Sequence, residues 1–137
     1  MSGRKHVLPQ YTTLSPTTNN MTGSATLTTA VTDIRFLDDI GFQFDWTGSP
    51  TGTFQVEVSA NHNQDPQGNV VTAGTWVPLT FTYWNGSSFV TSTTIPTSVG
   101  SPIYLDLGLL SGPWIRAQYT NSASTGTLTA TICGKQV

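Results

Sequence analysis

Side chains that could act as an acid, a base or a nucleophile are few in this chain and widely spaced. His62 lies close to Asp65, but no serine or cysteine beside it belongs to a nucleophile motif. Asp38 and Asp39 are adjacent, and neighbours on a strand face opposite sides. The sequence has no GxSxG, HExxH, phosphate-binding-loop or GxGxxG motif. We therefore expect no catalytic residues, no cofactor and no enzymatic activity.

Two weaker signals for metal binding are also present. Oxygen-bearing side chains recur at alternate positions from Asn61 to Asn69, which resembles the spacing of calcium ligands. The segment lacks the glycine and the closing acidic residue of a calcium loop, so we interpret it as a solvated hairpin loop in which His62→Ala leaves folding intact. Cys133 has no second cysteine and no nearby histidine, so we expect a small apolar core residue and no metal site.

Aromatic side chains are the remaining candidates for function. Exposed tryptophans on a β-sandwich can stack against sugars or anchor a protein interface, because both uses need a large rigid apolar surface. The alternative is that most of them fill the core, as the alternation around Trp46 predicts for that residue. The candidate interface residues are Arg4, Lys5, Tyr11, Trp76, Trp84 and Trp114.

Composition excludes several classes of protein. Only 9% of the 137 residues are charged, against about 25% in typical domains. Four tryptophans and an aromatic content of 10% nevertheless favour a folded chain, since disordered chains lack aromatic residues. A net charge of −2 gives no basic field for nucleic acid, and no apolar run is long enough to cross a membrane. The single cysteine cannot form an internal disulfide.

Alternating apolar and polar residues predict antiparallel strands with one buried face. The clearest alternation covers residues 40–46, 53–60, 114–120 and 126–133. Two short connections, Thr47–Gly52 and Asn121–Gly126, separate these strands. We predict that the two strands flanking each connection form a β-hairpin. The predicted core residues are Phe42, Phe44, Val56, Val58, Ile115, Leu128 and Ile132.

Further strands are predicted at residues 25–31, 75–84, 87–93 and 103–107. Asn85-Gly86 predicts a tight type I′ turn, because this dipeptide readily takes two successive positive φ values. The expected fold is an all-β antiparallel sandwich of seven or eight strands, with a jelly-roll or an immunoglobulin-like topology.

The first 24 residues differ in composition from the rest of the chain. They contain few apolar side chains, so we expect residues 1–24 to form an extended N-terminal arm and residues 25–137 to form the β-sandwich domain. A disordered tail is the alternative. Because the first strand of the sandwich is predicted at about residue 25, removal of residues 1–24 is expected to change the melting temperature by only a few degrees. The start Met1–His6 is basic but leads into polar residues, which is not typical of a secretory signal.

Two segments together resemble a known class of protein. They are DDIGFQFDWTGSPTGTFQVEVS at residues 38–59 and LDLGLLSGPWIRAQYTNSASTGTLTATICGK at residues 105–135. This pattern, which covers about residues 33–135, resembles small β-sandwich virion structural proteins of tailed bacteriophages. The resemblance implies a head decoration or cement protein that is made in the host cytoplasm and located in the virion. It also implies a homo-oligomer, most simply a trimer, that contacts the major capsid protein or other virion proteins.

Two alternatives remain open at this stage. The chain could be a tail or vertex adaptor of the same particle, or a carbohydrate-binding module that uses Trp76, Trp84 or Trp114. In the decoration protein the arm would reach a neighbouring subunit, and Arg4 and Lys5 would meet an acidic capsid surface. No membrane partner is expected, and nucleic acid is the less favoured partner of the two basic residues.

Overall fold

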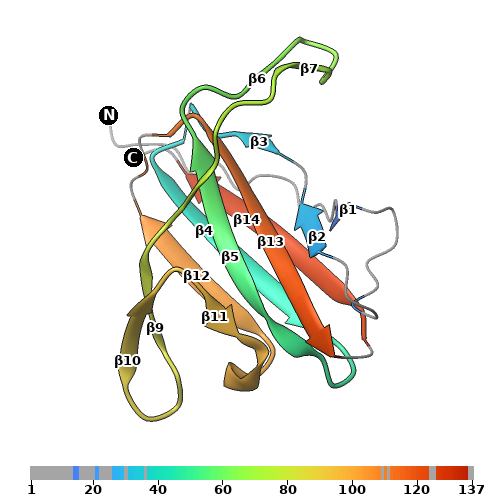
Figure 1. The fold of residues 1–137 in the computed structure, drawn as a ribbon. Coiled ribbons are helices and arrows are strands. Elements are labelled where there is room, and N and C mark those ends of the chain that lie inside the picture. Colours follow the sequence, from blue (N-terminus) through green and yellow to red (C-terminus); the bar gives the residue numbers. More distant parts are fainter. Residues whose placement is uncertain are drawn as a thin grey trace.

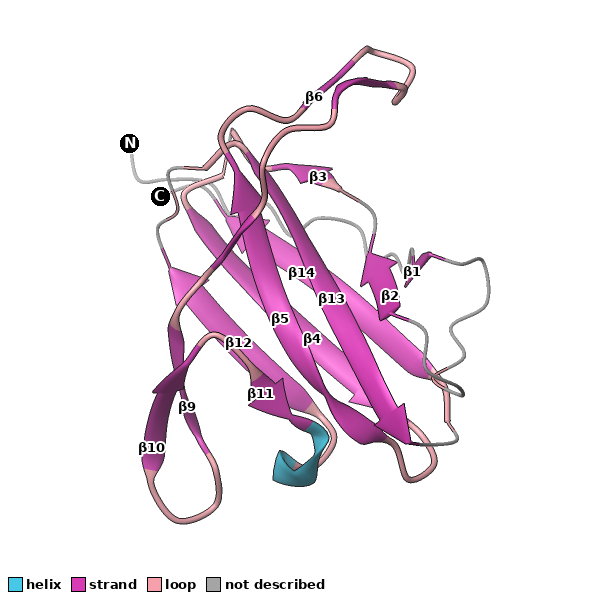
Figure 2. Ribbon diagram, viewed as in Figure 1, coloured by secondary structure: helices cyan, strands magenta, loops and turns pink. Residues whose placement is uncertain are grey.

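The computed structural model describes residues 14–15, 21, 26–29, 31–35, 37–108, 110, 112–123 and 126–135, and these are mostly strand (Figure 2). The strands are β1 (Leu14–Ser15), β2 (Thr26–Thr29), β3 (Thr32–Asp33), β4 (Asp39–Trp46), β5 (Thr51–Ser59), β6 (Asn63–Gln64), β7 (Val70–Thr72), β8 (Val77–Pro78), β9 (Phe81–Trp84), β10 (Phe89–Ser92), β11 (Ile95–Pro96), β12 (Ile103–Gly108), β13 (Trp114–Ala123) and β14 (Leu128–Lys135). A 3-10 helix, η1 (Thr97–Val99), is the one helical element in this part of the chain. None of its helices could therefore cross a membrane.

Two antiparallel sheets pack face to face, which confirms the predicted all-β sandwich (Figure 1). The larger sheet has the order β1-β2-β13-β5-β11, with β3 also paired to β13 and β8 to β5. The smaller sheet has the order β12-β4-β14. The pairs β9–β10 and β6–β7 are separate hairpins. The described residues form fourteen strands, more than the predicted seven or eight, and several of these strands contain only two residues.

The two predicted hairpins at Thr47–Gly52 and Asn121–Gly126 are wrong. β4 and β5 lie in different sheets, and so do β13 and β14, so each connection crosses from one sheet to the other. The strands face each other through their apolar sides, as the stacked rings of Phe44 and Phe54 show with centroids 4.5 Å apart. Alternation reports which face of a strand is buried, but it carries no information about the neighbour to which the strand hydrogen-bonds.

The Asn85-Gly86 hairpin is present, but its turn differs from the predicted type I′ turn. Trp84 pairs with Phe89, so four residues form the loop. Among the described residues only glycines have positive φ, and Gly86 has a φ of 101°. The Asn85 side-chain oxygen instead accepts hydrogen bonds from the backbone N–H groups of Ser87 and Ser88. Asn85 thus stabilises the turn through its side chain and does not adopt the left-handed backbone conformation that a type I′ turn requires.

The predicted strand at residues 75–84 is divided into β8 and β9. Pro78 lies in β8, which pairs with β5 through Glu57 and Val58. Proline lacks an N–H group and is tolerated in sheets mainly on edge strands. β8 is such a strand, because β5 is its one partner among the described strands. The chain then leaves the larger sheet, and β9 pairs with β10.

The core between the sheets contains the residues that alternation predicts. Phe42, Phe44, Val56, Ile115, Leu128 and Ile132 are buried, and the half-buried Val58 packs against them. Cys133 is not part of this core, contrary to prediction. Alternate residues of a strand share a face, so Cys133 lies with Thr129 and Thr131 on the outer face of β14. There its sulfur contacts the Tyr104 hydroxyl.

Part of the segment predicted as an arm lies on the sandwich. Met21 is 1% exposed within the core, and its backbone N–H donates to the carbonyl of Gly126. β1 pairs with β2 through Leu14 and Ser15. The other residues of the predicted arm lie outside the described part of the chain. Removal of residues 1–24 would therefore remove the buried Met21 side chain from the core. The expectation of a small change in melting temperature did not take this loss into account.

Candidate functional site

A stack of aromatic and cationic side chains lies on the outer face of the larger sheet. His62 is 6% exposed, and its ring lies between those of Trp76 and Trp114, at centroid distances of 5.3 Å and 5.1 Å. The guanidinium of Arg116 lies 4.3 Å from the Trp76 ring centroid, and that of Arg35 lies 5.5 Å from the Trp114 centroid. Cations over indole faces are attracted by the ring quadrupole. We call these five residues the His62 stack.

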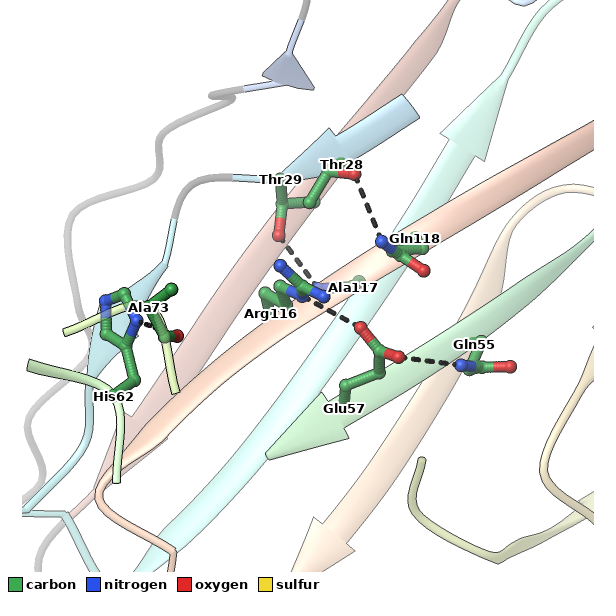
Figure 3. Close-up of polar contacts among 9 residues, drawn as sticks. All are labelled: Thr28, Thr29, Gln55, Glu57, His62, Ala73, Arg116, Ala117 and Gln118. Atoms are coloured by element: carbon green, nitrogen blue, oxygen red, sulfur yellow. Dashed lines mark hydrogen bonds and ion pairs between the residues drawn. The ribbon is translucent and has the colours of Figure 1, made fainter. Parts of the chain in front are cut away.

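Hydrogen bonds hold the His62 ring at the centre of the stack. Nδ1 lies 2.8 Å from the carbonyl oxygen of Ala73 (Figure 3). Nε2 lies 3.0 Å from the side-chain nitrogen of Gln64. A carbonyl oxygen only accepts, so Nδ1 carries the proton and Nε2 accepts from Gln64. Ala73 and Gln64 both lie in the 60–76 loop, so these bonds hold that loop together. The ring contact with Trp114 of β13 joins the loop to the larger sheet. His62 is a buried structural residue, which the interpretation as a solvated loop residue missed.

The arginines at the two ends of the stack are each paired with a carboxylate. Arg116 Nε donates to Glu57 Oε1 at 2.8 Å across the β13–β5 ladder, and Gln55 donates to Glu57 Oε2 at 3.0 Å (Figure 3). Arg35 forms an ion pair with Asp33. The side-chain hydrogen bond from Arg35 holds the pKa of Asp33 below its ordinary value. The charges of the stack are therefore compensated within the protein.

The predicted hairpin loop after β5 is confirmed, with β6 and β7 paired through Asn63 and Thr72. At its tip, Asp65 accepts hydrogen bonds from the backbone N–H groups of Gln67 and Asn69. These bonds, that from Asn69 foremost, hold the pKa of Asp65 below its ordinary value. Asp65 thus closes the turn. No group of three histidine, cysteine or carboxylate side chains able to hold a metal ion occurs among the described residues.

A shallow cavity of about 390 Å³ lies between this loop and the end of the stack. Its lining residues are Val31, Asp33, Arg35, Gln64, Asp65, Pro66, Gly68 and Trp114. Asp33 already binds Arg35, and Asp65 already binds its own loop. The charged groups of the cavity are therefore engaged in holding the fold.

The β9–β10 hairpin has one buried and one exposed face. Phe81 and Tyr83 point to the sandwich and pack with its core. Trp84 and Phe89 form a cross-strand pair on the opposite face, where they are 52% and 73% exposed. Their rings touch edge to face at a centroid distance of 5.1 Å. The hairpin projects from one side of the sandwich, beside β11 and β12 (Figure 1).

The exposed hairpin face carries no charge. Thr82 and Thr91 complete it next to the aromatic pair, and their hydroxyls lie 3.0 Å apart. The whole sequence from Pro66 to Leu105 contains no Asp, Glu, Lys, Arg or His. We call Thr82, Trp84, Phe89 and Thr91 the hairpin face. A rigid, neutral surface with two exposed aromatic rings is typical of a contact anchor for another molecule.

The candidate interface residues occupy different places. Trp84 lies on the hairpin face, Trp76 is half-buried under Arg116, and Trp114 is 7% exposed at the end of the His62 stack. The remaining candidates are Arg4, Lys5 and Tyr11, which lie outside the described residues. Phe89 was not among the candidates. Phe89 lies opposite Trp84 because four residues form the hairpin loop. The two-residue turn predicted from the sequence would have placed Ser87 opposite Trp84 instead.

Comparisons with known proteins add no relative to this description. No protein-family model matches the chain, and no curated protein matches it. Its function is therefore inferred from its own residues and their geometry.

Proposed function

We propose that this chain is a non-enzymatic structural protein of a tailed-bacteriophage particle, which binds the head surface as a decoration protein. The observation that carries the proposal is the neutral hairpin face, with Trp84 and Phe89 exposed side by side. The likeness of residues 38–59 and 105–135 to virion β-sandwich proteins supports the choice of particle.

The hairpin face suits a protein contact on physical grounds. Aromatic side chains bury about 150–250 Å² each, and they dominate the energy of many interfaces. The ring–ring contact between Trp84 and Phe89 orders both side chains before binding, which lowers the entropy that a partner must remove. A neutral face also binds with little dependence on salt, because no charge pairs are screened.

The same geometry disfavours a sugar-binding platform built from several tryptophans. Trp114 is buried in the His62 stack, and Arg116 covers a face of Trp76. Trp84 is the one indole of the three that is largely exposed, and its neighbours on the hairpin face are Phe89 and threonines. The polar groups that usually orient a sugar next to an aromatic ring are limited here to hydroxyls.

The test is a binding experiment with particles that lack the protein. Purified full-length chain is added to such heads, and the bound fraction is measured by co-sedimentation at low and high salt. We expect binding with little salt dependence, and at least a tenfold loss for the Trp84→Ser/Phe89→Ser double variant. Val70→Ser/Val71→Ser is the matched control, because it also replaces two exposed apolar residues and lies on β7.

Electron microscopy of complete particles then locates the protein. Density distributed over the head lattice is expected. Density confined to the tail or to a single vertex would replace the decoration role by an adaptor role. Saccharide binding that is lost in the double variant, without any particle binding, would overturn the proposal in favour of a carbohydrate-binding module.

A further inference from the structure

The β9–β10 hairpin is a two-stranded sheet with one free edge. Within the described residues, β10 pairs only with β9, and β9 is the strand that contacts β12. Two-stranded ribbons are marginally stable, and a third strand adds stability. The free edge of β10 therefore presents unpaired backbone groups next to the hairpin face.

The register shows which groups these are. Asn85 N–H donates to the carbonyl of Ser88 at 3.0 Å, so this pair is of the hydrogen-bonded kind. Hydrogen-bonded and non-hydrogen-bonded pairs alternate along an antiparallel ladder, which makes Trp84–Phe89 and Thr82–Thr91 non-hydrogen-bonded pairs. The close hydroxyls of Thr82 and Thr91 agree with this, since side chains approach more closely in such pairs. The N–H and C=O groups of Phe89 and Thr91 thus point away from β9.

A second copy of the same edge is a suitable partner for these groups. Antiparallel pairing about a two-fold axis places the donors of one strand opposite the acceptors of the other. Edges that avoid such pairing usually carry a charge, a proline or a bulge. β10 has the sequence FVTS, without a charge or a proline, and its ladder with β9 is regular. No like charges meet when two such edges approach each other, since the sequence from Pro66 to Leu105 is uncharged.

We propose that two copies of this chain pair edge to edge through β10, so that their hairpins form one four-stranded antiparallel sheet. The two-fold axis places both hairpin faces on the same side of that sheet, because they are related by an axis perpendicular to it. The aromatic pairs of the two copies then form one larger apolar surface. The pairing depends on the backbone edge and does not require the proposed role in a phage particle.

The contact is a modest one. Four residues of each β10 strand take part, and the area is below the roughly 800 Å² per partner of a standard stable interface. The dimer is therefore expected to form reversibly and to depend on protein concentration. Copies held close together on a larger assembly would pair more completely, because their effective concentration is higher.

The test is sedimentation equilibrium of the full-length chain over a range of concentrations. We expect a monomer–dimer equilibrium for the wild type. Thr91→Pro removes one outward N–H at the centre of the edge and leaves the bonds between β9 and β10, so it should be monomeric throughout. Thr91→Val is the matched control and should dimerise like the wild type, because it keeps the N–H and a β-branched side chain. Far-UV circular dichroism checks the fold of each variant.

Thr91→Lys keeps the proposal testable if the proline variant fails to fold. The Thr91 side chain is exposed, so lysine is accommodated, but two lysines meet near the two-fold axis. Dimerisation should weaken at least tenfold at low salt and recover in part at high salt. A wild type that stays monomeric at its highest soluble concentration would overturn the proposal. So would a trimer, or folded Thr91→Pro and Thr91→Lys variants that associate like the wild type. Loss of dimerisation with intact particle binding would leave the proposed function in place.

Discussion

Replacement of His62 by alanine should destabilise the protein substantially, although its position in a polar loop suggested no effect. The lost contacts are the hydrogen bond to the Ala73 carbonyl and the ring contacts with Trp76 and Trp114. The hydrogen bond contributes about 1 kcal/mol and each ring contact about 0.5–1.5 kcal/mol. The bond from Gln64 is not counted, because that half-buried amide can turn to water. The free energy of unfolding should fall by about 2–4 kcal/mol, a large part of the usual 5–15 kcal/mol.

Urea unfolding at neutral pH measures this change. Tryptophan fluorescence reports on Trp76 and Trp114 near the substitution, and far-UV circular dichroism reports on the whole sandwich. His62→Phe separates the two contributions, because it keeps an aromatic ring between the indoles and removes both hydrogen bonds. It should lie between the wild type and His62→Ala. Asn63→Ala is the matched control on an exposed neighbour and should change the stability by less than about 0.5 kcal/mol.

A His62→Ala variant within about 0.5 kcal/mol of the wild type would refute this reasoning. Such a result would mean that the 60–76 loop is held by its own hairpin bonds alone. A change seen by fluorescence but absent from circular dichroism would mean that the loop opens without unfolding of the sheets.

The remaining predictions concern the core and the titrating groups. Phe44→Ala should lower the free energy of unfolding by about 3–5 kcal/mol, and Met21→Ala by about 2–5 kcal/mol, because both side chains are fully buried; urea unfolding measures each. Asp65 has a lowered folded pKa, so its stabilising contribution is present above the unfolded value of about 3.9 and is lost as the pH falls through the folded pKa. Acid unfolding of Asp65→Asn should therefore begin from a lower stability and show a shallower dependence on pH. Partial burial, and next the contact with Cys133, raise the pKa of Tyr104 from 10.0 to about 12, so the stability it contributes should be lost as the pH rises between these values. Ultraviolet titration should show a late phenolate signal that Tyr104→Phe removes, and an unchanged titration in that variant would contradict the assignment.

Much of the fold could be predicted from alternation alone. Residues 40–46 and 53–60 alternate between apolar and polar side chains, and the structure buries Phe42, Phe44 and Val56 as expected. Cys133 shares the parity of its threonine neighbours, so the same pattern, applied strictly, would have placed it outside the core. Met21 was missed because a single apolar residue in a polar segment gives no periodic signal.

The candidate site was only partly accessible from the sequence. Trp84 stood out because it lies beside Asn85-Gly86, a recognisable turn. The exposure of its ring depends on which hairpin face packs against the sandwich, and Phe81 and Tyr83 decide that by their contacts with the core. His62, Trp76 and Trp114 come from separate segments of the chain, so no local pattern could show that the His62 ring contacts both indoles.

The sequence by itself determined that the chain forms strands and which side of each long strand is apolar, because side-chain parity is a local property with a period of two. Only the tertiary structure decided that β4 and β5 belong to different sheets, and that a buried histidine joins two tryptophans. The physical reason is that hydrogen bonding between strands and burial under a loop are long-range events. They depend on how complete apolar faces fit together, and a short alternating segment is compatible with many such arrangements.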